Sequence, residues 1–402
     1  MNRLRIALLI LPVVSLIAGN IFLPEKEINE KAYLHEIAPE VEFSEKKEAP
    51  PHYKSEENIV AFNSYDIVPS IRGYAGPIKL LLALNKNGDI TGIRILEHRE
   101  TENYVHYMLN PRYLKQFLGK NVNNPFEAGM DIDGISRATE SVQALSETIR
   151  DSSREIASRV YGLEVKGQEG RQRFNIRWVL YSFLFLSALT FYYVTRRSKG
   201  LLKTRDITLV LGLLLIGLYL AAPFSILHIF NLLLLRFSSS VLWYIIVIST
   251  IISILLAGRF YCGWLCPFGA LAEFIGRLPF RKWGLSVESD DRWRNLKYLL
   301  LSVIVIIVCT SRHIEYGNYE TYITLFSLHG NALTWSLVVL MLIINVRVER
   351  FWCRYLCPVA AFTGLLSRRE SGYISKKDCP MANRHNPLIS ECIRCNKCYT
   401  GK

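Results

Sequence analysis

The chain contains the stretch RFYCGWLCP at residues 259–267 and repeats it as RFWCRYLCP at residues 350–358. Each copy sets two cysteines four positions apart, which brings both thiols to one face of a helix. The proline after the second cysteine is expected to stop that helix just beyond the thiol. Two such pairs at matching depth can bring four thiolates together, and soft thiolates favour an iron–sulfur cluster.

These four cysteines have other interpretations. Free cysteine packs like a small hydrophobic residue, and a dithiol redox pair or a zinc site would use the same residue type. One Cys-x-x-x-Cys-Pro can arise by chance, whereas two in the same sequence context favour an iron–sulfur or redox site. The sequence leaves open whether both pairs share one cluster. The candidate ligands are Cys262, Cys266, Cys353 and Cys357.

A second cysteine cluster lies near the C-terminus, where DCP at residues 378–380 is followed by CIRCNKC at residues 392–398. Cys-x-x-Cys-x-x-Cys is the ferredoxin loop that holds three corners of a [4Fe–4S] cluster, and a Cys-Pro elsewhere supplies the fourth ligand. Zinc is less favoured, because zinc sites usually show two ligand pairs rather than a triplet and one. The ninth cysteine, Cys309, stands alone and is expected to be packed. The predicted ligands of this cluster are Cys379, Cys392, Cys395 and Cys398.

The apolar residues are concentrated in long blocks, and half of the 402 residues are hydrophobic. Residues 6–23 form an apolar run without a clear small-x-small cleavage site, which favours an uncleaved anchor over a signal peptide. Runs shorter than the ~20 residues that span ~30 Å of hydrocarbon can be completed by flanking aromatic, lysine or arginine side chains. We therefore expect six membrane-spanning helices with both termini in the cytoplasm. The five further runs lie at about 178–195, 207–222, 241–257, 298–310 and 333–346.

The positive charge of the chain lies beside the apolar runs. The formal net charge is +13, yet residues 24–176 hold 20 basic and 24 acidic residues. No basic helix interleaved with aromatic residues is present, so nucleic acid is not an expected partner. The segments expected in the cytoplasm hold 25 Lys or Arg against 9 acidic residues, and this bias predicts their side of the membrane. These segments are 1–5, 196–206, 258–297 and 347–402.

The segment after the anchor is interpreted as a linker followed by a small α+β domain outside the membrane. Residues 24–60 are rich in Glu, Lys and Pro and show little core-forming pattern. From Ile71 onward, apolar and polar residues alternate on both sides of the Asn-Gly-Asp turn at residues 87–89, which predicts a β-hairpin. The run after Ser136 carries apolar positions at helical spacing.

Between the hairpin and this helix lies DGISRATES at residues 133–141. Ser136 is a suitable helix N-cap, which would place Thr139 in the first turn, where exposed backbone N–H groups favour a phosphate. A phosphoester on Thr139 would therefore be well placed. On physical grounds alone, an ordinary capped helix is the simpler interpretation.

The same stretch resembles the Asp-x-x-Ser/Thr-Gly-Ala-Thr motif of domains that carry FMN covalently on threonine, attached by a flavin transferase. RGYAGPI at residues 72–78 and HRET at residues 98–101 resemble further motifs of that domain. Arg137 stands where the motif usually has glycine. The resemblance implies a phosphoester between FMN and Thr139. The matching motif residues are Asp133, Ser136, Ala138 and Thr139.

The order of segments resembles the NosR/NirI family over essentially the whole chain, and the short tail is most similar to the RdhC branch encoded with reductive dehalogenases. The resemblance implies a polytopic α-helical membrane protein of the cytoplasmic membrane. It would have about six transmembrane helices, an exoplasmic α+β FMN-binding domain and a short ferredoxin-like tail. The implied domains are an anchor (1–23), a linker (24–60), the FMN-binding domain (61–170), a five-helix membrane domain (171–366) and a cytoplasmic 4Fe–4S tail (367–402).

The resemblance also implies electron transfer between the quinone pool or cytoplasmic donors and an exoplasmic respiratory reductase. The flavin and the clusters would lie on opposite faces of ~30 Å of hydrocarbon, so an intermediate carrier is needed, and a quinone such as menaquinone is the simplest one. The chain would then be a redox carrier or quinol-oxidising flavoprotein of anaerobic respiration rather than an enzyme with its own small-molecule substrate. The alternative is a membrane redox sensor, regulator or maturation factor for such a reductase.

Overall fold

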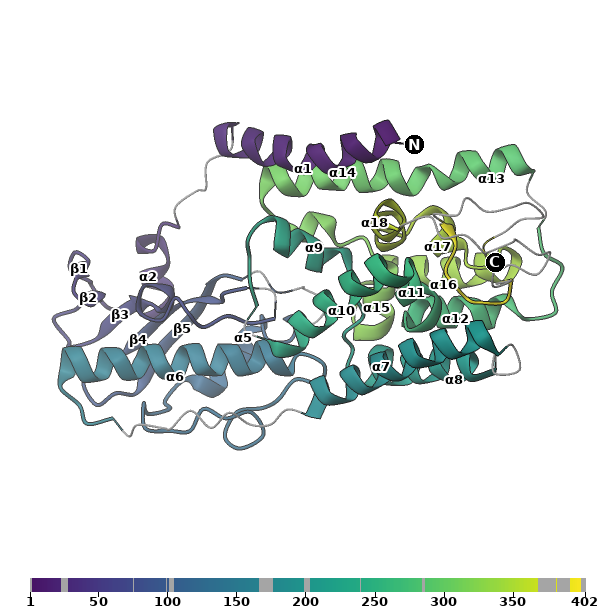
Figure 1. Ribbon diagram of the computed structural model, residues 1–402. Coiled ribbons are helices and arrows are strands. Elements are labelled where there is room, and N and C mark those ends of the chain that lie inside the picture. Colours follow the sequence, from purple (N-terminus) through teal and green to yellow (C-terminus); the bar gives the residue numbers. More distant parts are fainter. Residues whose placement is uncertain are drawn as a thin grey trace. The chain divides into compact units, whose positions relative to one another are not determined.

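The protein forms two compact units in the computed structural model (Figure 1). The helical unit comprises Met1–Leu23, Asn175–Leu235 and Val241–Lys402. The sheet unit comprises Pro24–Phe174 together with the short segment Arg236–Ser240. The structure describes residues 2–22, 28–74, 76–98, 100, 105–165, 176–198, 203–238, 240–283, 286–367, 381 and 391–398.

The sheet unit is built around a five-stranded antiparallel sheet in the order β1-β2-β3-β4-β5. The predicted hairpin is confirmed, since β4 and β5 pair around a turn in which Gly88 has a φ of +82°. Residues 24–60, expected to be a linker, contribute a helix and two strands to this unit. The strands are β1 (Lys47–Glu48), β2 (Pro51–Lys54), β3 (Val60–Asn63), β4 (Lys79–Leu84) and β5 (Ile90–Glu97).

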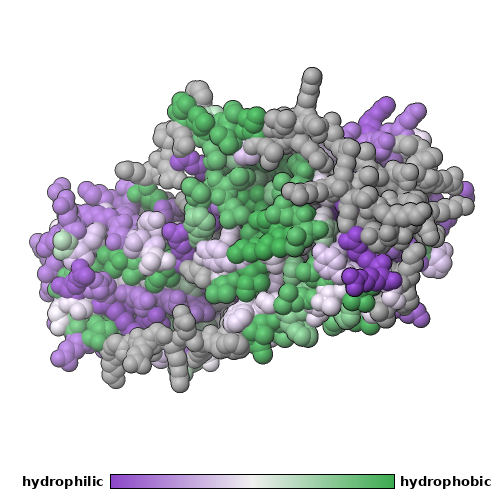
Figure 2. All heavy atoms as spheres, in the orientation of Figure 1, coloured by the Kyte–Doolittle hydropathy of each residue, from purple (hydrophilic) through white to green (hydrophobic). Residues whose placement is uncertain are grey.

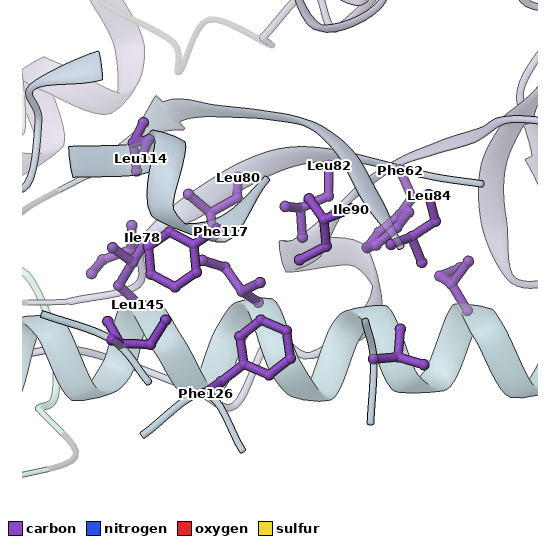
Figure 3. Packing of buried hydrophobic residues seen from close by; sticks show 14 of the residues in the cluster. Phe62, Ile78, Leu80, Leu82, Leu84, Ile90, Leu114, Phe117, Phe126 and Leu145 are labelled. Carbon is purple, nitrogen blue, oxygen red and sulfur yellow. The ribbon is translucent and has the colours of Figure 1, made fainter. Parts of the chain in front are cut away.

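Both faces of β4 are buried, because a helix covers each face of the sheet. Leu80 and Leu82 belong to the main core, which lies between the sheet and α6 (Thr139–Tyr161) (Figure 3). Leu81 belongs to a smaller core on the opposite face, against α2 (Lys31–Ile37). This alternation is the period-two pattern of a strand between two layers. The other helices among the described residues of this unit are α3 (Ser64–Ile67), α5 (Pro111–Leu114) and the 3₁₀ helix η1 (Lys115–Phe117).

In the helical unit, the sequence repeat is also a structural repeat. Each copy forms three consecutive helices: a long helix, a one-turn helix that carries the first cysteine, and a third helix that begins at the motif proline. The first copy consists of α10 (Val241–Ala257), α11 (Phe260–Trp264) and α12 (Pro267–Gly276). The second copy consists of α16 (Ala332–Arg347), α17 (Phe351–Tyr355) and α18 (Pro358–Leu366).

The other helices of this unit surround the repeat. The N-terminal helix α1 lies beside α14 (Figure 1). A Cβ on Gly19 would lie 2.5 Å from the Thr310 carbonyl oxygen, so this close approach requires glycine. The helices are α1 (Asn2–Phe22), α7 (Ile176–Arg197), α8 (Lys203–Leu211), the π-helix η3 (Gly212–Tyr219), α9 (Ile226–Leu233), α13 (Val287–Arg294), α14 (Leu296–Ser311), the 3₁₀ helix η4 (Ile314–Gly317) and α15 (Thr321–Ser327).

The prediction of six membrane spans is not met by the described residues. Two helices there are long and apolar enough to cross a membrane, Ile176–Arg197 and Glu288–Ser311, and a third appears only if α15 and α16 are counted as one span bent by 106°. Two of the other predicted runs are interrupted or short. The run at 207–222 passes from α8 into a π-helix, and α10 has only 17 residues. Apolar composition alone therefore overstated the number of straight spans.

Apolar side chains nevertheless cover much of the helical unit. Figure 2 shows hydrophobic residues gathered over its helices and hydrophilic residues over the sheet unit. Phe183, Leu255 and Leu333 are 72%, 52% and 68% exposed, respectively. A soluble protein rarely leaves a continuous apolar surface of this kind uncovered. The surface therefore agrees with the membrane protein that the apolar runs predict.

Candidate flavin and iron–sulfur sites

The predicted flavin attachment residue, Thr139, is the first residue of the long helix α6. Its side chain is exposed, and the backbone N–H groups of the first helical turn have no partners within the helix. Ser136 does not cap this helix as predicted, because the N-cap is Ala138 and no side chain accepts from the first turn. The physical reason lies at Arg137, whose φ of +72° breaks the helical path between Ser136 and Thr139.

The side chains of Tyr113 and Gln116 form hydrogen bonds with the backbone of Asp133 in this motif. Tyr113 donates its hydroxyl hydrogen to the Asp133 carbonyl at 2.6 Å, and the Asp133 N–H donates to Gln116 Oε1 at 2.7 Å. Burial raises the pKa of Tyr113 to about 12, so its hydroxyl remains a donor at neutral pH. Asp133 and Ser136 themselves are exposed, whereas Ala138 is buried.

The three segments that resemble flavin-domain motifs meet in the sheet unit. Ser141, in the first turns of α6, donates its hydroxyl to Glu100 Oε2 at 2.5 Å, and both side chains are buried. Gly73 lies against the same carboxylate, since a Cβ there would be 2.3 Å from Glu100 Oε1. Arg99 and Thr101 lie outside the described residues. The sequence placed these motifs far apart, and the fold brings them together around Glu100.

The residues around this point fit a phosphate-bearing cofactor. His98 Nδ1 and Glu140 Oε2 are buried atoms without a hydrogen-bond partner among the described residues. Buried polar atoms are normally paired, so these two atoms suit a polar ligand, and Glu140 is the second residue of α6. Free N–H groups at a helix N-terminus favour a phosphate. FMN supplies both a phosphate and a polar ring system.

The loop that joins α9 to α10 belongs to the sheet unit. Arg72 Nη1 donates to the Phe237 carbonyl at 3.3 Å, and Ser238 Oγ donates to the Gly73 carbonyl at 3.2 Å. Residues 72 and 73 open the RGYAGPI motif. The loop therefore binds to one of the segments that resemble the flavin domain.

The two cysteine motifs have the same local structure. In the first, α11 ends at Trp264 and Cys266 becomes the N-cap of α12, with its Sγ accepting from Gly269 N at 3.4 Å. In the second, Cys357 Sγ accepts from Ala360 N at the same distance. The prediction that the motif proline stops the cysteine helix is therefore wrong. The proline starts the next helix, because a missing N–H costs nothing at the first helical position.

Cys262, Cys353 and Cys357 are buried, and Cys266 is partly buried. Burial raises the pKa of the Cys353 thiol; the charge of Arg350 opposes this shift and a neighbouring Cys262 thiolate adds to it. For the Cys266 thiol, burial again raises the pKa, and charges on Cys262 and Cys353 add to this effect. A buried thiol ionises only if the negative charge of its thiolate is compensated, and a coordinated metal ion provides that compensation. Cys309 is fully buried in α14, in agreement with a packing role.

Two arginines accompany the motifs, and sequence analysis gave them no role. Arg259 and Arg350 open the two copies, and neither has any exposed surface. Arg350 donates to the Cys262 carbonyl at 3.0 Å and to Glu273 Oε2 at 2.7 Å. Glu273 also accepts a bidentate pair from Arg205. Their position at the start of both copies was the signal in the sequence that could have identified them.

These arginines also fit iron–sulfur clusters. Arg259 Nε and Nη2, Arg350 Nε and Trp352 Nε1 are buried donors without an acceptor among the described residues. A thiolate-bound cluster is an anion whose sulfur atoms accept hydrogen bonds. In the described part of the chain, no three His, Cys, Asp or Glu side chains are already grouped as a single metal site. Cys379 lies outside the described residues.

The tail motif lies against the first cysteine motif, residues 259–267. Cys395, Ile393 and Met381 form one buried cluster with Cys262. The described cysteines are all free thiols, and those of the tail are buried. The two cysteine regions predicted separately from the sequence are therefore neighbours in the helical unit.

Comparisons with known proteins identify both kinds of domain. Residues 73–153 match an FMN-binding domain, which includes Thr139, and residues 239–286 and 328–377 match a 4Fe-4S binding domain, which includes both cysteine motifs of the repeat. No solved structure matches the chain significantly.

Curated relatives agree with this assignment. The Escherichia coli protein named "Putative electron transport protein YccM" is 30% identical over 38% of this chain and 44% of its own length. The regulatory protein NosR of Stutzerimonas stutzeri is 31% identical over 39% of this chain and 25% of its own length. The protein NirI of Paracoccus denitrificans is 30% identical over 34% of this chain and 24% of its own length. The chain thus spans less than half the length of these relatives.

An FMN-binding domain and a 4Fe-4S binding domain occur here in one chain, together with similarity to NosR and NirI. In both kinds of domain the chain is therefore similar to proteins of the NosR/NirI type.

Proposed function

We propose that this protein carries electrons across the cytoplasmic membrane, between the quinone pool or cytoplasmic donors and a respiratory reductase on the outer side. One observation supports the proposal: along the chain, α10 lies between a loop of the sheet unit and the first cysteine motif. The loop before α10 binds Gly73 of the flavin domain, and the first cysteine motif follows directly after α10. With 17 residues, α10 is shorter than the ~20 residues that span the hydrocarbon core, so flanking aromatic, lysine or arginine side chains would complete its crossing.

The flavin is proposed to be covalent, with its phosphate esterified to Thr139 Oγ1 by a flavin transferase. The exposed position of Thr139 at the start of α6 supports this, because a modifying enzyme must reach the hydroxyl. The backbone N–H groups of the first turn would then bind the remaining phosphate oxygens. Asp133, Ser136 and Ala138 would shape the approach to this residue. Covalent attachment also suits a location outside the cell, where a dissociated flavin would be lost.

Mass spectrometry of peptides that span Thr139, taken from native membranes, tests this attachment. We expect a peptide heavier by one FMN, and a Thr139→Ala variant that lacks bound flavin after denaturation. Gln143→Ala, which changes an exposed residue of the same helix, should keep the flavin. An unmodified peptide from functional membranes would contradict the attachment.

The iron–sulfur ligands are proposed to be Cys262, Cys266, Cys353 and Cys357 in the repeat. The tail cysteines Cys379, Cys392, Cys395 and Cys398 would hold a further [4Fe–4S] cluster. Such clusters supply one-electron transfer, whereas FMN exchanges either one or two electrons. The protein's contribution is to exclude water from the thiols and to place buried arginines beside them. Arg259 and Arg350 would compensate the negative charge of clusters held there.

The electron donor is proposed to be a quinol such as menaquinol. Reduced menaquinone analogue, mixed with reconstituted protein, should reduce the flavin on a turnover timescale, as followed by flavin absorbance. No reduction on that timescale would count against quinol as the donor. We further propose the RdhC branch of the family, with a reductive dehalogenase as the exoplasmic partner.

A second function is a membrane redox sensor, or a maturation factor for such a reductase. The observation that favours it is the name of the relative NosR, which is called a regulatory protein. Thr139→Ala separates the two functions. Under electron transfer this variant loses respiratory activity with the reductase present at normal abundance. Under sensing or maturation, the abundance or cofactor content of the reductase changes instead.

A further inference from the structure

The start of the tail motif is buried inside the helical unit. Glu391 and Arg394 each have 1% of their surface exposed. Trp264, in the first cysteine motif, donates its indole N–H to the Arg394 carbonyl at 2.9 Å. This part of the tail is therefore a component of the helical core rather than a separate ferredoxin domain.

Glu391 meets two cations that are also fully buried. Arg259 Nη1 lies 2.9 Å from Glu391 Oε2, and Lys297 Nζ donates to the same oxygen at 2.5 Å. Tyr298 donates its hydroxyl to Glu391 Oε1 at 2.8 Å. A buried charge without a partner is strongly destabilising. Without Glu391, both cations would lose their only carboxylate among the described residues.

The internal repeat explains why this carboxylate must come from the tail. In the second copy, Arg350 pairs with Glu273, which lies six positions after the proline of the first copy. The corresponding position of the second copy is Gly364, which has no side chain to pair with Arg259. The repeat therefore supplies a carboxylate for one of its two arginines only. Glu391 supplies the other.

A glycine permits the close approach of the tail. A Cβ on Gly263 would lie 1.9 Å from the Ile393 carbonyl oxygen, a distance that no real side chain could adopt. The second copy has Arg354 at the matching position. Because Gly263 has no side chain, the tail backbone can approach the residue next to Cys262. This agrees with the buried cluster that contains Cys262 and Cys395.

We infer that Glu391 is a positioning residue: its ion pairs with Arg259 and Lys297 hold the C-terminal cysteine triplet against the first cysteine motif, so that the iron–sulfur sites of tail and membrane exchange electrons directly. The inference rests on the proposed cluster ligands. It goes beyond them in naming the residue that couples the two sites and the glycine that permits their contact.

Paramagnetic resonance of the full-length protein, reduced with dithionite, tests this inference. Two neighbouring reduced clusters broaden each other's signals. We expect such coupling in the wild type, its loss in Glu391→Gln, and its retention in Glu391→Asp. Gly263→Ala should abolish the coupling by an independent route, because it displaces the tail without changing a charge. Asp206→Asn removes a half-exposed partner of Arg277, and Gly276→Ala meets mainly the flexible Glu349 side chain; both should keep the coupling.

Iron and sulfide content separates this inference from the proposed function. Full content with no coupling in the wild type, or with unchanged coupling in both Glu391→Gln and Gly263→Ala, would overturn the docking role. Low content in the wild type would instead contradict the proposed clusters.

In that case, thiol labelling of metal-free protein still decides the docking: Cys395 should react at least about tenfold faster in Glu391→Gln than in wild type. Equal labelling rates would refute it. If Glu391→Gln does not fold, Lys297→Met combined with Glu391→Gln removes one charge of each sign and takes its place.

Discussion

Arg137 shows how a single residue can depart from a motif while the backbone keeps its shape. The flavin motif usually has glycine at this position, and the φ of Arg137 is +72°, in the left-handed region that favours glycine. A residue with a side chain pays ~1–2 kcal/mol in that conformation. The turn before α6 is thus the one that glycine would adopt, and Thr139 remains the first helical residue.

Arg137→Gly should therefore stabilise the sheet unit by ~1 kcal/mol and leave flavin attachment intact. The midpoint of thermal unfolding, followed by flavin fluorescence in the full-length protein, measures the change. Arg112→Gly is the matched control, since Arg112 lies within α5 and glycine there costs ~1 kcal/mol. A similar loss of stability in both variants would show that the left-handed backbone carries no strain.

At the scale of elements, the sequence predicted the strands and helices that depend on local residue patterns. Alternation around residues 87–89 predicted the hairpin, and helical spacing after residue 136 predicted α6. The first residue of α6 could not be predicted, because the conformation of Arg137 overrides the capping preference of Ser136. The role of Glu391 was also hidden, because its partners Lys297 and Arg259 lie 94 and 132 residues away.

The contact between α2 and the sheet is expected to depend on pH through Glu30, the residue before α2. Burial raises the pKa of Glu30, but hydrogen bonds from Lys46 and Asn63 outweigh this effect and leave it lowered. Because the pKa is lowered on folding, ionised Glu30 stabilises the fold at any pH above the pKa of the unfolded chain, ~4.3. This contribution is lost as the pH falls through the lower pKa of the folded state. Hydrogen-exchange protection of α2 should therefore fall below about pH 4. Glu30→Gln should remove this dependence, and Glu40→Gln, an exposed control, should retain it. Unchanged protection in the wild type at low pH would contradict the role of Glu30.

At the scale of the whole molecule, the motifs predicted the similarity to NosR and NirI, whereas the apolar runs did not predict the number of spans. Apolar runs predicted six spans, and the described residues contain two straight ones, or three with the bent pair. In the helical unit, the run at 207–222 passes from α8 into a π-helix, and composition does not report such a break. The separation of the chain into a sheet unit and a helical unit agrees with two cofactor domains.

The flavin domain and the cysteine motifs are proposed to face opposite sides of the membrane. A membrane-impermeant maleimide, applied to right-side-out vesicles, tests it with one cysteine in each region. Met130→Cys probes the sheet unit and Trp283→Cys probes the segment after α12, since both native side chains are well exposed. We predict that Met130→Cys reacts at once and that Trp283→Cys reacts only after permeabilisation. Reaction of both from the same side of the intact membrane would contradict the account.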